Sequence, residues 1–293
     1  MPAPDYETLI DAATWGFVRA SEAAYPSDAV DLTMAQQRSA YDTMCAVFYA
    51  GRPAGVQVRD VTIGGVPCRH YAGSGVTVVY VHGGGFVLGS LDSHDDVCAE
   101  IAHATGFAVV SVDYRLSPEH AHPAAYDDAL AVVRAVVGRV VLVGDSAGAN
   151  LAAAVAASVE VAGQVLIYPG LGGDRAKGSY LTHAHAPMLT LADVDFYASI
   201  RHGGAEPVGD ATAAPLQALD FTGLPPTVAF SAECDPLADD ARDYVVRIVA
   251  AGGQAEWVNE AGLVHGYLRA RHAVPRAKDS FARIVAAIAA FGQ

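Results

Sequence analysis

The stretch VVLVGDSAGANLAAAVAA, residues 140–157, joins a run of small and apolar residues directly to an alanine-rich helical pattern. Between the two stands Ser146, surrounded by Gly144, Ala147 and Gly148 in the pattern G-x-S-x-G. A serine at a sharp turn between a strand and a helix needs small neighbours, because the two elements approach closely there. Its hydroxyl then projects above the strand, at the positive end of the helix. The stretch therefore predicts a strand–turn–helix corner that presents a reactive serine.

Short β-branched runs alternate with helical segments on both sides of this corner. The strand candidates are residues 76–81, 107–114, 140–145, 164–169, 227–233 and 254–259, preceded by a hairpin of 56–63 and 66–71 joined at Gly64-Gly65. The helical candidates among them are residues 92–105, 123–137, 147–158, 239–251 and 276–291. These strand runs are nearly all apolar, which is typical of strands covered on both faces. The alternation predicts the α/β class, with a mostly parallel, doubly wound sheet and right-handed crossovers.

Two segments do not follow this alternation of strands and helices. Residues 5–24 and 33–49 are predicted to be helices, separated at Pro26 and with Thr33 as an N-cap. Residues 170–222 are rich in Gly, Pro and His around one helix near 190–200. We expect residues 1–50 and the insertion at 170–222 to form a helical cap on a main domain of residues 51–293.

Composition narrows the class of protein further. The chain has 293 residues, 52% of them hydrophobic and 17% charged, which is enough for a large buried core. Its net charge of −14 argues against binding to nucleic acid or to an anionic membrane. The N-terminus lacks a signal-peptide pattern, and no apolar run approaches the roughly 20 residues that span a bilayer. The four cysteines form no C-x-x-C pair. We therefore expect a cytoplasmic protein that does not act at a membrane.

A glycine-rich loop follows the strand at 76–81. Its sequence HGGGF, residues 82–86, suits a loop that offers backbone N–H groups to a developing oxyanion, together with the N–H of Ala147. The donors could come from Gly83, Gly84 or Gly85. A phosphate-binding loop is the alternative, but no Lys-Ser/Thr follows, and Leu88 stands where the last glycine of G-x-G-x-x-G would be.

An acid and a histidine follow later strands. Asp235, in SAECDPLADDARDY, is placed to orient an imidazole, whereas Asp239 and Asp240 are expected to begin a helix. His265, in VHGYL, lies in a loop beyond a late strand. The chain order Ser146, Asp235, His265 is the one that α/β-hydrolases use for a catalytic triad.

With these motifs in place, the chain resembles bacterial esterases of the hormone-sensitive-lipase-like branch of the α/β-hydrolases. The resemblance covers about residues 75–270, in HGGGF, DYRLSPEHAHPAAYDDA (113–129), GDSAGANLAA, DPLADDARDY and HGY. It implies an eight-stranded sheet, helices on both faces, a helical cap, and an oxyanion hole of Gly84, Gly85 and Ala147. Ala149 departs from the glycine that many members carry, which adds a methyl group behind the corner.

The same resemblance implies the reaction, which is hydrolysis of short- to medium-chain acyl esters of small molecules through an acyl-enzyme, with no cofactor or metal. Phe86, Tyr180, Met188, Phe196 and Tyr197 are candidates for the walls of the substrate pocket. Relatives commonly dimerise through an edge of the sheet, so a homodimer is one option for the assembly.

Three other functions share some of these features. A small-molecule receptor on the same fold would be expected to lack the triad histidine, which is present here as His265. An amidase, a lactonase or an acyltransferase could use the same three side chains. A metal-dependent hydrolase would need a third ligand beside His183-Ala-His185 or His94-Asp95-Asp96, and neither set has a recognisable one.

Overall fold

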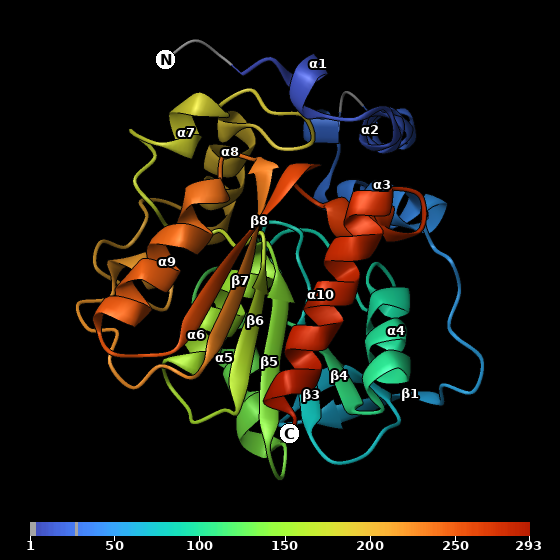
Figure 1. Cartoon of the computed structure of the whole chain (residues 1–293), viewed down its shortest axis with the longest axis vertical. Helices are drawn as coiled ribbons and strands as arrows, with labels where there is room; N and C mark the ends of the chain where they lie inside the picture. The colour runs from blue at the N-terminus through green and yellow to red at the C-terminus, as the bar shows by residue number, and fades with distance from the viewer. Residues whose placement is uncertain (1–3, 27–28) are drawn as a thin grey trace.

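The alternating pattern forms an eight-stranded sheet in the computed structural model, which describes residues 4–26 and 29–293 (Figure 1). The strands are β1 (Val58–Ile63), β2 (Val66–Tyr71), β3 (Thr77–Val81), β4 (Ala108–Val112), β5 (Val140–Asp145), β6 (Gly163–Ile167), β7 (Thr227–Cys234) and β8 (Ala255–Val264). Their order is β1-β2-β4-β3-β5-β6-β7-β8. β2 is antiparallel to both of its neighbours, β1 and β4, and the other neighbouring strands pair in parallel. The predicted fold class, with a mostly parallel sheet, is confirmed.

The hairpin at the β1 edge of the sheet depends on two glycines. Gly64 and Gly65 have φ angles of 60° and 85°. Two consecutive residues with positive φ are what a two-residue hairpin turn with the right twist requires, and glycine adopts this conformation without strain. The sequence prediction of this turn is confirmed.

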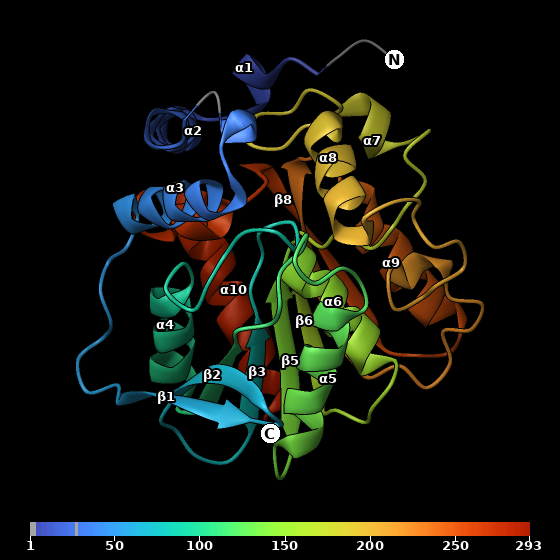
Figure 2. The ribbon, with the colours of Figure 1, turned by 180° about the vertical axis from the view of Figure 1, so that it is seen from behind.

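The helices either cover the two faces of the sheet or lie above the ends of its strands. They are α1 (Tyr6–Leu9), α2 (Ala12–Ala24), α3 (Met34–Val47), α4 (Asp95–Thr105), α5 (Ala124–Ala135), α6 (Ala147–Ala156), α7 (Ser179–Thr182), α8 (Leu191–His202), α9 (Ala238–Ala250) and α10 (Pro275–Phe291), with 3-10 turns η1 (Ala29–Asp31), η2 (Pro215–Gln217) and η3 (Tyr267–His272). One apolar core lies between the sheet and α4 with α10, and the other between the sheet and α5, α6 and α9 (Figures 1 and 2). Strands β5 and β6 are buried along their whole length, as expected for strands covered on both faces.

Two segments lie above the edge of the sheet that is formed by the carboxyl ends of β5 and β6. Helices α1, α2 and α3 come from the N-terminal segment, and α7 and α8 come from the chain between β6 and β7 (Figures 1 and 2). Thr33 caps α3 through a reciprocal pair of bonds with Gln36, as the sequence indicated. The helix expected at 5–24 is interrupted, because Asp11 accepts a hydrogen bond from the Thr14 N–H and begins α2 anew.

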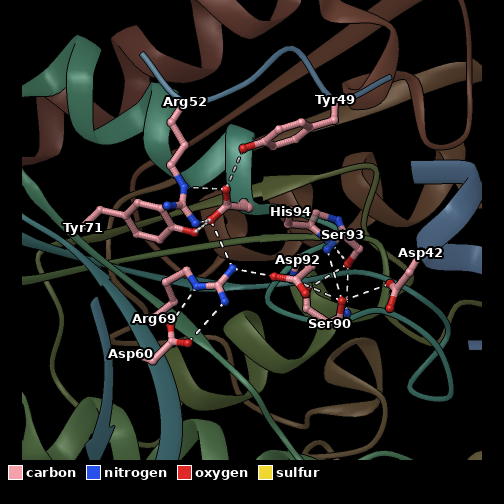
Figure 3. A network of polar contacts seen from close by, with 11 residues as sticks. Asp42, Tyr49, Arg52, Asp60, Arg69, Tyr71, Ser90, Asp92, Ser93 and His94 are labelled. Atoms are coloured by element: carbon pink, nitrogen blue, oxygen red, sulfur yellow. Dashed lines mark hydrogen bonds and ion pairs between the residues drawn. The ribbon is translucent and has the colours of Figure 1, made fainter. Parts of the chain in front are cut away.

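A buried carboxylate ties the N-terminal segment to the sheet. Asp95, in the first turn of α4, accepts hydrogen bonds from Arg52, Tyr49 and Tyr71, and Arg69 of β2 lies 3.2 Å from the same carboxylate (Figure 3). The side chain of Asp95 is nearly inaccessible, so its charge is stabilised by two guanidinium groups and two hydroxyls. The connection that follows α3 is thereby fixed against the sheet edge.

The described residues contain no helix with the length and apolar character needed to cross a bilayer. Cys45, Cys68, Cys98 and Cys234 are all free thiols and all buried.

Candidate active site

The corner between β5 and α6 has the geometry that its small residues allow. Ser146 adopts a φ of 54° and a ψ of −118°, a conformation that side chains rarely take, and α6 begins at Ala147. A Cβ atom on Gly148 would lie 2.0 Å from the Val81 carbonyl oxygen, and one on Gly144 would lie 2.5 Å from the Gly148 backbone. Neither glycine could carry a side chain, because the backbone of the neighbouring strand or helix already occupies that space.

The three predicted side chains converge at this corner. The Nε2 atom of His265 lies 2.9 Å from the Ser146 hydroxyl oxygen, and its Nδ1 atom lies 2.7 Å from Asp235 Oδ2. One imidazole thus contacts the hydroxyl on one side and the carboxylate on the other. This is the arrangement in which a histidine accepts a proton from serine while an acid holds its tautomer.

The ends of the last two strands position the acid and the histidine. Asp235 directly follows β7, is fully buried, and accepts a second hydrogen bond from the Leu237 N–H at 2.8 Å. His265 directly follows β8, which continues to Val264 and is therefore longer than the run at 254–259 suggested. Because β7 and β8 are parallel neighbours, their ends bring Asp235 and His265 to the same edge of the sheet.

The glycine loop supplies two free amides, not three. The N–H of Gly83 donates to Asp145 Oδ1 at 2.9 Å, so the expectation that Gly83 could serve as an oxyanion donor is wrong. Gly84, Gly85 and Ala147 border the cavity at Ser146, and among the described residues their N–H groups have no hydrogen-bond acceptor. A free N–H at Ala147 is expected for the first residue of a helix.

Asp145 links the corner to the glycine loop, a role that the sequence analysis missed. Besides the Gly83 N–H, its buried carboxylate accepts from the Tyr80 hydroxyl at 2.8 Å and from the Tyr168 hydroxyl at 3.4 Å. His94 Nε2 lies 3.3 Å away. Burial alone would raise the pKa of Asp145, but His94, Arg269 and the Tyr80 hydroxyl outweigh burial and hold that pKa well below its usual range. The carboxylate is therefore ionised and attracts the Gly83 amide.

The segment 113–129 braces the same loop from the other side, and this gives a structural meaning to a motif that had none in the sequence. The Tyr114 ring stacks on His82 at 4.3 Å, and its hydroxyl donates to the His82 carbonyl at 2.8 Å. The Ser117 N–H donates to the Phe86 carbonyl at 2.9 Å. From α3, Arg38 donates to the carbonyls of Val87 and Ser117. The loop is thus held at both of its ends.

A cavity of about 240 Å³ opens at Ser146. Of the candidate wall residues, Phe86, Tyr180, Met188 and Tyr197 line it. Phe196 is absent from the lining, to which α8 contributes Val194, Tyr197, Ala198, Arg201 and His202. Phe196 instead packs its ring against Tyr197 at 5.5 Å.

The acids that begin α9 do more than complement its dipole. Asp239 and Asp240 stand in its first turn, as predicted. Asp240 also accepts from the N–H groups of Leu171 and Gly173 and from the Tyr180 hydroxyl, and Asp239 accepts from the Ser179 N–H. Both therefore fasten the segment between β6 and β7 to α9.

The two candidate metal sets have other partners. His94 faces Asp145, Asp95 pairs with Arg52 and Arg69, and Asp96 pairs with Arg271. His183 accepts or donates a hydrogen bond at the Tyr6 hydroxyl, 3.1 Å away.

Comparison with known proteins agrees with this fold. A family model of the α/β-hydrolase fold matches residues 78–269. The carboxylesterase NlhH of Mycobacterium tuberculosis is 39% identical over 233 residues, which are 72% of this chain and 72% of that protein. The ethyl acetate hydrolase of Pseudomonas putida is 31% identical over 233 residues, 73% of each chain.

A solved structure extends the likeness to nearly the whole chain. The ester hydrolase EH1AB1 from the metagenome of Lake Arreo, in complex with a derivative of bipyridine phosphonate, superposes with a TM-score of 0.87 at 31% identity. The match covers 97% of this chain and 100% of that one. Fold and relatives together define the class, a carboxylic ester hydrolase. The chain belongs to the α/β-hydrolase family, in its hormone-sensitive-lipase-like branch of bacterial esterases.

Proposed function

We propose that this esterase works through a triad of Ser146, His265 and Asp235 and a covalent acyl-enzyme. The observation that carries the proposal is the pair of contacts made by one imidazole, 2.9 Å to the Ser146 hydroxyl and 2.7 Å to Asp235. Asp235 is fully buried, so its carboxylate holds the Nδ1 proton in place and stabilises the imidazolium when it forms.

In the first half-reaction, His265 Nε2 removes the hydroxyl proton while Ser146 Oγ bonds to the carbonyl carbon of the ester. The carbonyl oxygen becomes an oxyanion, which accepts hydrogen bonds from the N–H groups of Gly84, Gly85 and Ala147. As the bond to the alcohol oxygen breaks, His265 gives its proton to that oxygen. A water molecule then repeats the sequence on the acyl-enzyme, releasing the acid and restoring the Ser146 hydroxyl.

The cavity favours small acids and alcohols. Its volume of about 240 Å³ lies below the range of drug-sized pockets, and its walls are largely apolar. The ethyl acetate hydrolase of Pseudomonas putida is a relative whose name records a small ester substrate. We propose short- to medium-chain acyl esters as substrates.

Residues 1–50 and 170–222 are proposed to act together as the cap over this cavity. In the described part of these segments, Tyr25, Tyr41 and Met44 line the cavity from the N-terminal side, and Tyr180 and Tyr197 line it from the other side. The Tyr6 hydroxyl and His183 join the two segments at 3.1 Å.

The test is removal of the hydroxyl. Ser146→Ala should lower kcat/KM for p-nitrophenyl butyrate by at least about 10⁴-fold, because the nucleophile is lost. Ser39→Ala removes an exposed serine on α3 and should leave the rate unchanged. A p-nitrophenyl phosphonate should label the wild-type protein at Ser146, as read by mass spectrometry. Wild-type hydrolysis in Ser146→Ala would overturn the mechanism.

Location and assembly complete the proposal. All four cysteines are free and buried, which suits a reducing compartment, so we propose the cytoplasm. The net charge of −14 gives no electrostatic attraction for nucleic acid. A homodimer is the proposed assembly, and sedimentation at several protein concentrations tests it, with a concentration-independent monomer as the contrary result.

A further inference from the structure

A buried arginine lies in the wall of the cavity at Ser146, and among the described residues it has no acidic partner. Arg201, on the cavity face of α8, is 6% exposed. Its Nη1 atom donates to the Ala213 carbonyl at 2.8 Å, and its Nη2 atom donates to Asn150 Oδ1 at 3.1 Å. The guanidinium carbon lies 3.6 Å from the centre of the Phe86 ring. Within residues 4–26 and 29–293, no carboxylate pairs with it.

Such burial is costly for a cation whose partners are all neutral. Arg271 shows the ordinary solution, because it is buried to a similar degree and pairs with Asp96 and Glu100 at 2.7 Å each. Desolvation lowers the pKa of Arg201 to about 9, in keeping with a charge that its surroundings leave uncompensated. This uncompensated positive charge lies in the wall of the cavity and not on the outer surface.

The other charges of the cavity wall are already engaged. Arg175 and Glu206 pair with each other at 2.7 Å. Asp145 is held by the Gly83 N–H and the Tyr80 hydroxyl. Arg269 donates to the Tyr41 hydroxyl and to Cys45 Sγ, and the negative charge of Asp145 acts on it. In the described cavity wall of this chain, whose net charge is −14, Arg201 and Arg269 both lack a carboxylate partner, and of the two only Arg201 has a pKa below its usual value.

The position of this cation relates it to the reacting atoms. Arg201 contacts Asn150, which stands one helical turn along α6 from Ser146 and donates its backbone N–H to the Ser146 carbonyl. Asn150 Nδ2 donates to the carbonyls of Gly170 and Ala213, so its Oδ1 is fixed toward the guanidinium. Only two of the five guanidinium N–H bonds are used in these contacts.

We infer that Arg201 is a specificity residue that binds a carboxylate on the substrate, so that the preferred esters carry one free carboxylate a few carbon atoms from the ester bond. The planar N–H fork of arginine matches a carboxylate in a way that a neutral acyl chain cannot. The inference rests on the proposed function, because it concerns the substrate of the same Ser146 site.

Matched substrates test it in two arms. For the acid side, the p-nitrophenyl monoester of glutaric acid is compared with its neutral analogue, in which an isopropyl group replaces the carboxylate. For the alcohol side, the acetyl ester of γ-hydroxybutyrate is compared with the corresponding isopropyl analogue by pH-stat. Rates without enzyme are subtracted. In at least one arm, wild type should prefer the charged ester by about tenfold or more in kcat/KM, the size of a hydrogen bond to a charged group.

Variants then assign the preference to a residue. Arg201→Met should lower the ratio of charged to neutral kcat/KM by about tenfold or more, and Arg201→Lys should restore part of it. Arg247→Met is the matched control, because Arg247 also donates to a backbone carbonyl and faces an aromatic ring but lies outside the cavity. It should leave the ratio as in wild type.

Two results would overturn the inference. One is a wild-type protein that shows no preference for the charged ester in either arm. This measurement does not depend on whether any variant folds. The other is a preference that persists in Arg201→Met. In either case, loss of hydrolysis of the neutral esters in Ser146→Ala would show that the triad still holds, so the two proposals fail independently.

Discussion

Asp145 connects two parts of the site, the corner that carries Ser146 and the glycine loop. It precedes Ser146, the proposed nucleophile, in the chain, and its carboxylate accepts a hydrogen bond from the Gly83 amide at 2.9 Å. Gly83 is held, whereas the N–H groups of Gly84 and Gly85, which border the cavity, have no acceptor among the described residues. We regard Asp145 as a positioning residue for the oxyanion donors.

Replacing Asp145 by Asn should therefore lower kcat for p-nitrophenyl butyrate by about 10- to 100-fold, with little change in KM, because the amide hydrogen bonds strengthen chiefly in the transition state. The free energy of unfolding should fall by about 1–3 kcal/mol through weaker acceptance from Tyr80 and Gly83. Asp127→Asn, at an exposed position on α5, is the control. A variant that loses stability but keeps kcat would assign Asp145 a purely structural role.

The residues that sequence reasoning found and missed differ in a physical way. Ser146, Asp235 and His265 stand directly after strands, and the order of strands in an α/β sheet brings such positions together. Arg201 and Asp145 act through contacts across the fold, with Asn150 and with Gly83 respectively, and no spacing in the sequence encodes these contacts. Asp145 occupies the first variable position of the G-x-S-x-G pattern, and the pattern alone gives that position no role.

At the scale of elements, the corner between β5 and α6 depends on how closely the helix approaches the sheet. Gly148 lies on α6 where any side chain would meet the Val81 and His82 carbonyls of the neighbouring strand and loop. These same elements carry Ser146 and the glycine loop, so the closeness of the packing sets the distance between the Ser146 hydroxyl and the proposed oxyanion donors.

A methyl group at this position should act on that packing. Gly148→Ala should lower the free energy of unfolding by about 2–4 kcal/mol, because its Cβ must displace backbone atoms. Gly16→Ala on α2 meets nothing within 4 Å and should raise it by about 0.5–1 kcal/mol, the gain of alanine over glycine in a helix. Urea unfolding of both variants provides the measurement. Equal effects of the two substitutions would contradict the close approach.

The elements themselves were largely predictable because local and global signals agree. The apolar runs of β3, β5 and β6 and the paired glycines between β1 and β2 each have one low-energy conformation in a layered fold. The departures came from side chains that compete with the helix pattern. Asp11 caps a new helix inside the run at 5–24, and α7 forms where Asp239 accepts from the Ser179 N–H.

At the scale of the whole molecule, acid should destabilise the fold through the buried His82. His82 stacks on Tyr114 and His94 in the interior, and burial lowers its pKa to about 4. The unfolded chain therefore binds a proton on this residue between about pH 6.5 and pH 4, where the folded chain does not. Its contribution to stability is complete above this window and is lost as the pH falls through it.

The drop in the free energy of unfolding between pH 7 and pH 4.5 should accordingly be about 2–3 kcal/mol smaller in His82→Asn than in wild type. Comparing each protein with itself at two pH values removes any general loss of stability caused by the substitution. His120→Asn, at an exposed position, should keep the wild-type difference. An unchanged difference in His82→Asn would show that His82 takes up its proton equally in both states.

The hydrogen bond between Gly83 and Asp145 also affects when the glycine loop becomes ordered, either during folding or during each turnover. The loop is bonded at Gly83, Phe86 and Val87 before any ester arrives. The conformational entropy of arranging the two amides is therefore lost once, when the chain folds, and not again at every turnover. Such an enzyme should approach its transition state with a small activation entropy for loop ordering, so that the temperature dependence of its chemical step is chiefly enthalpic.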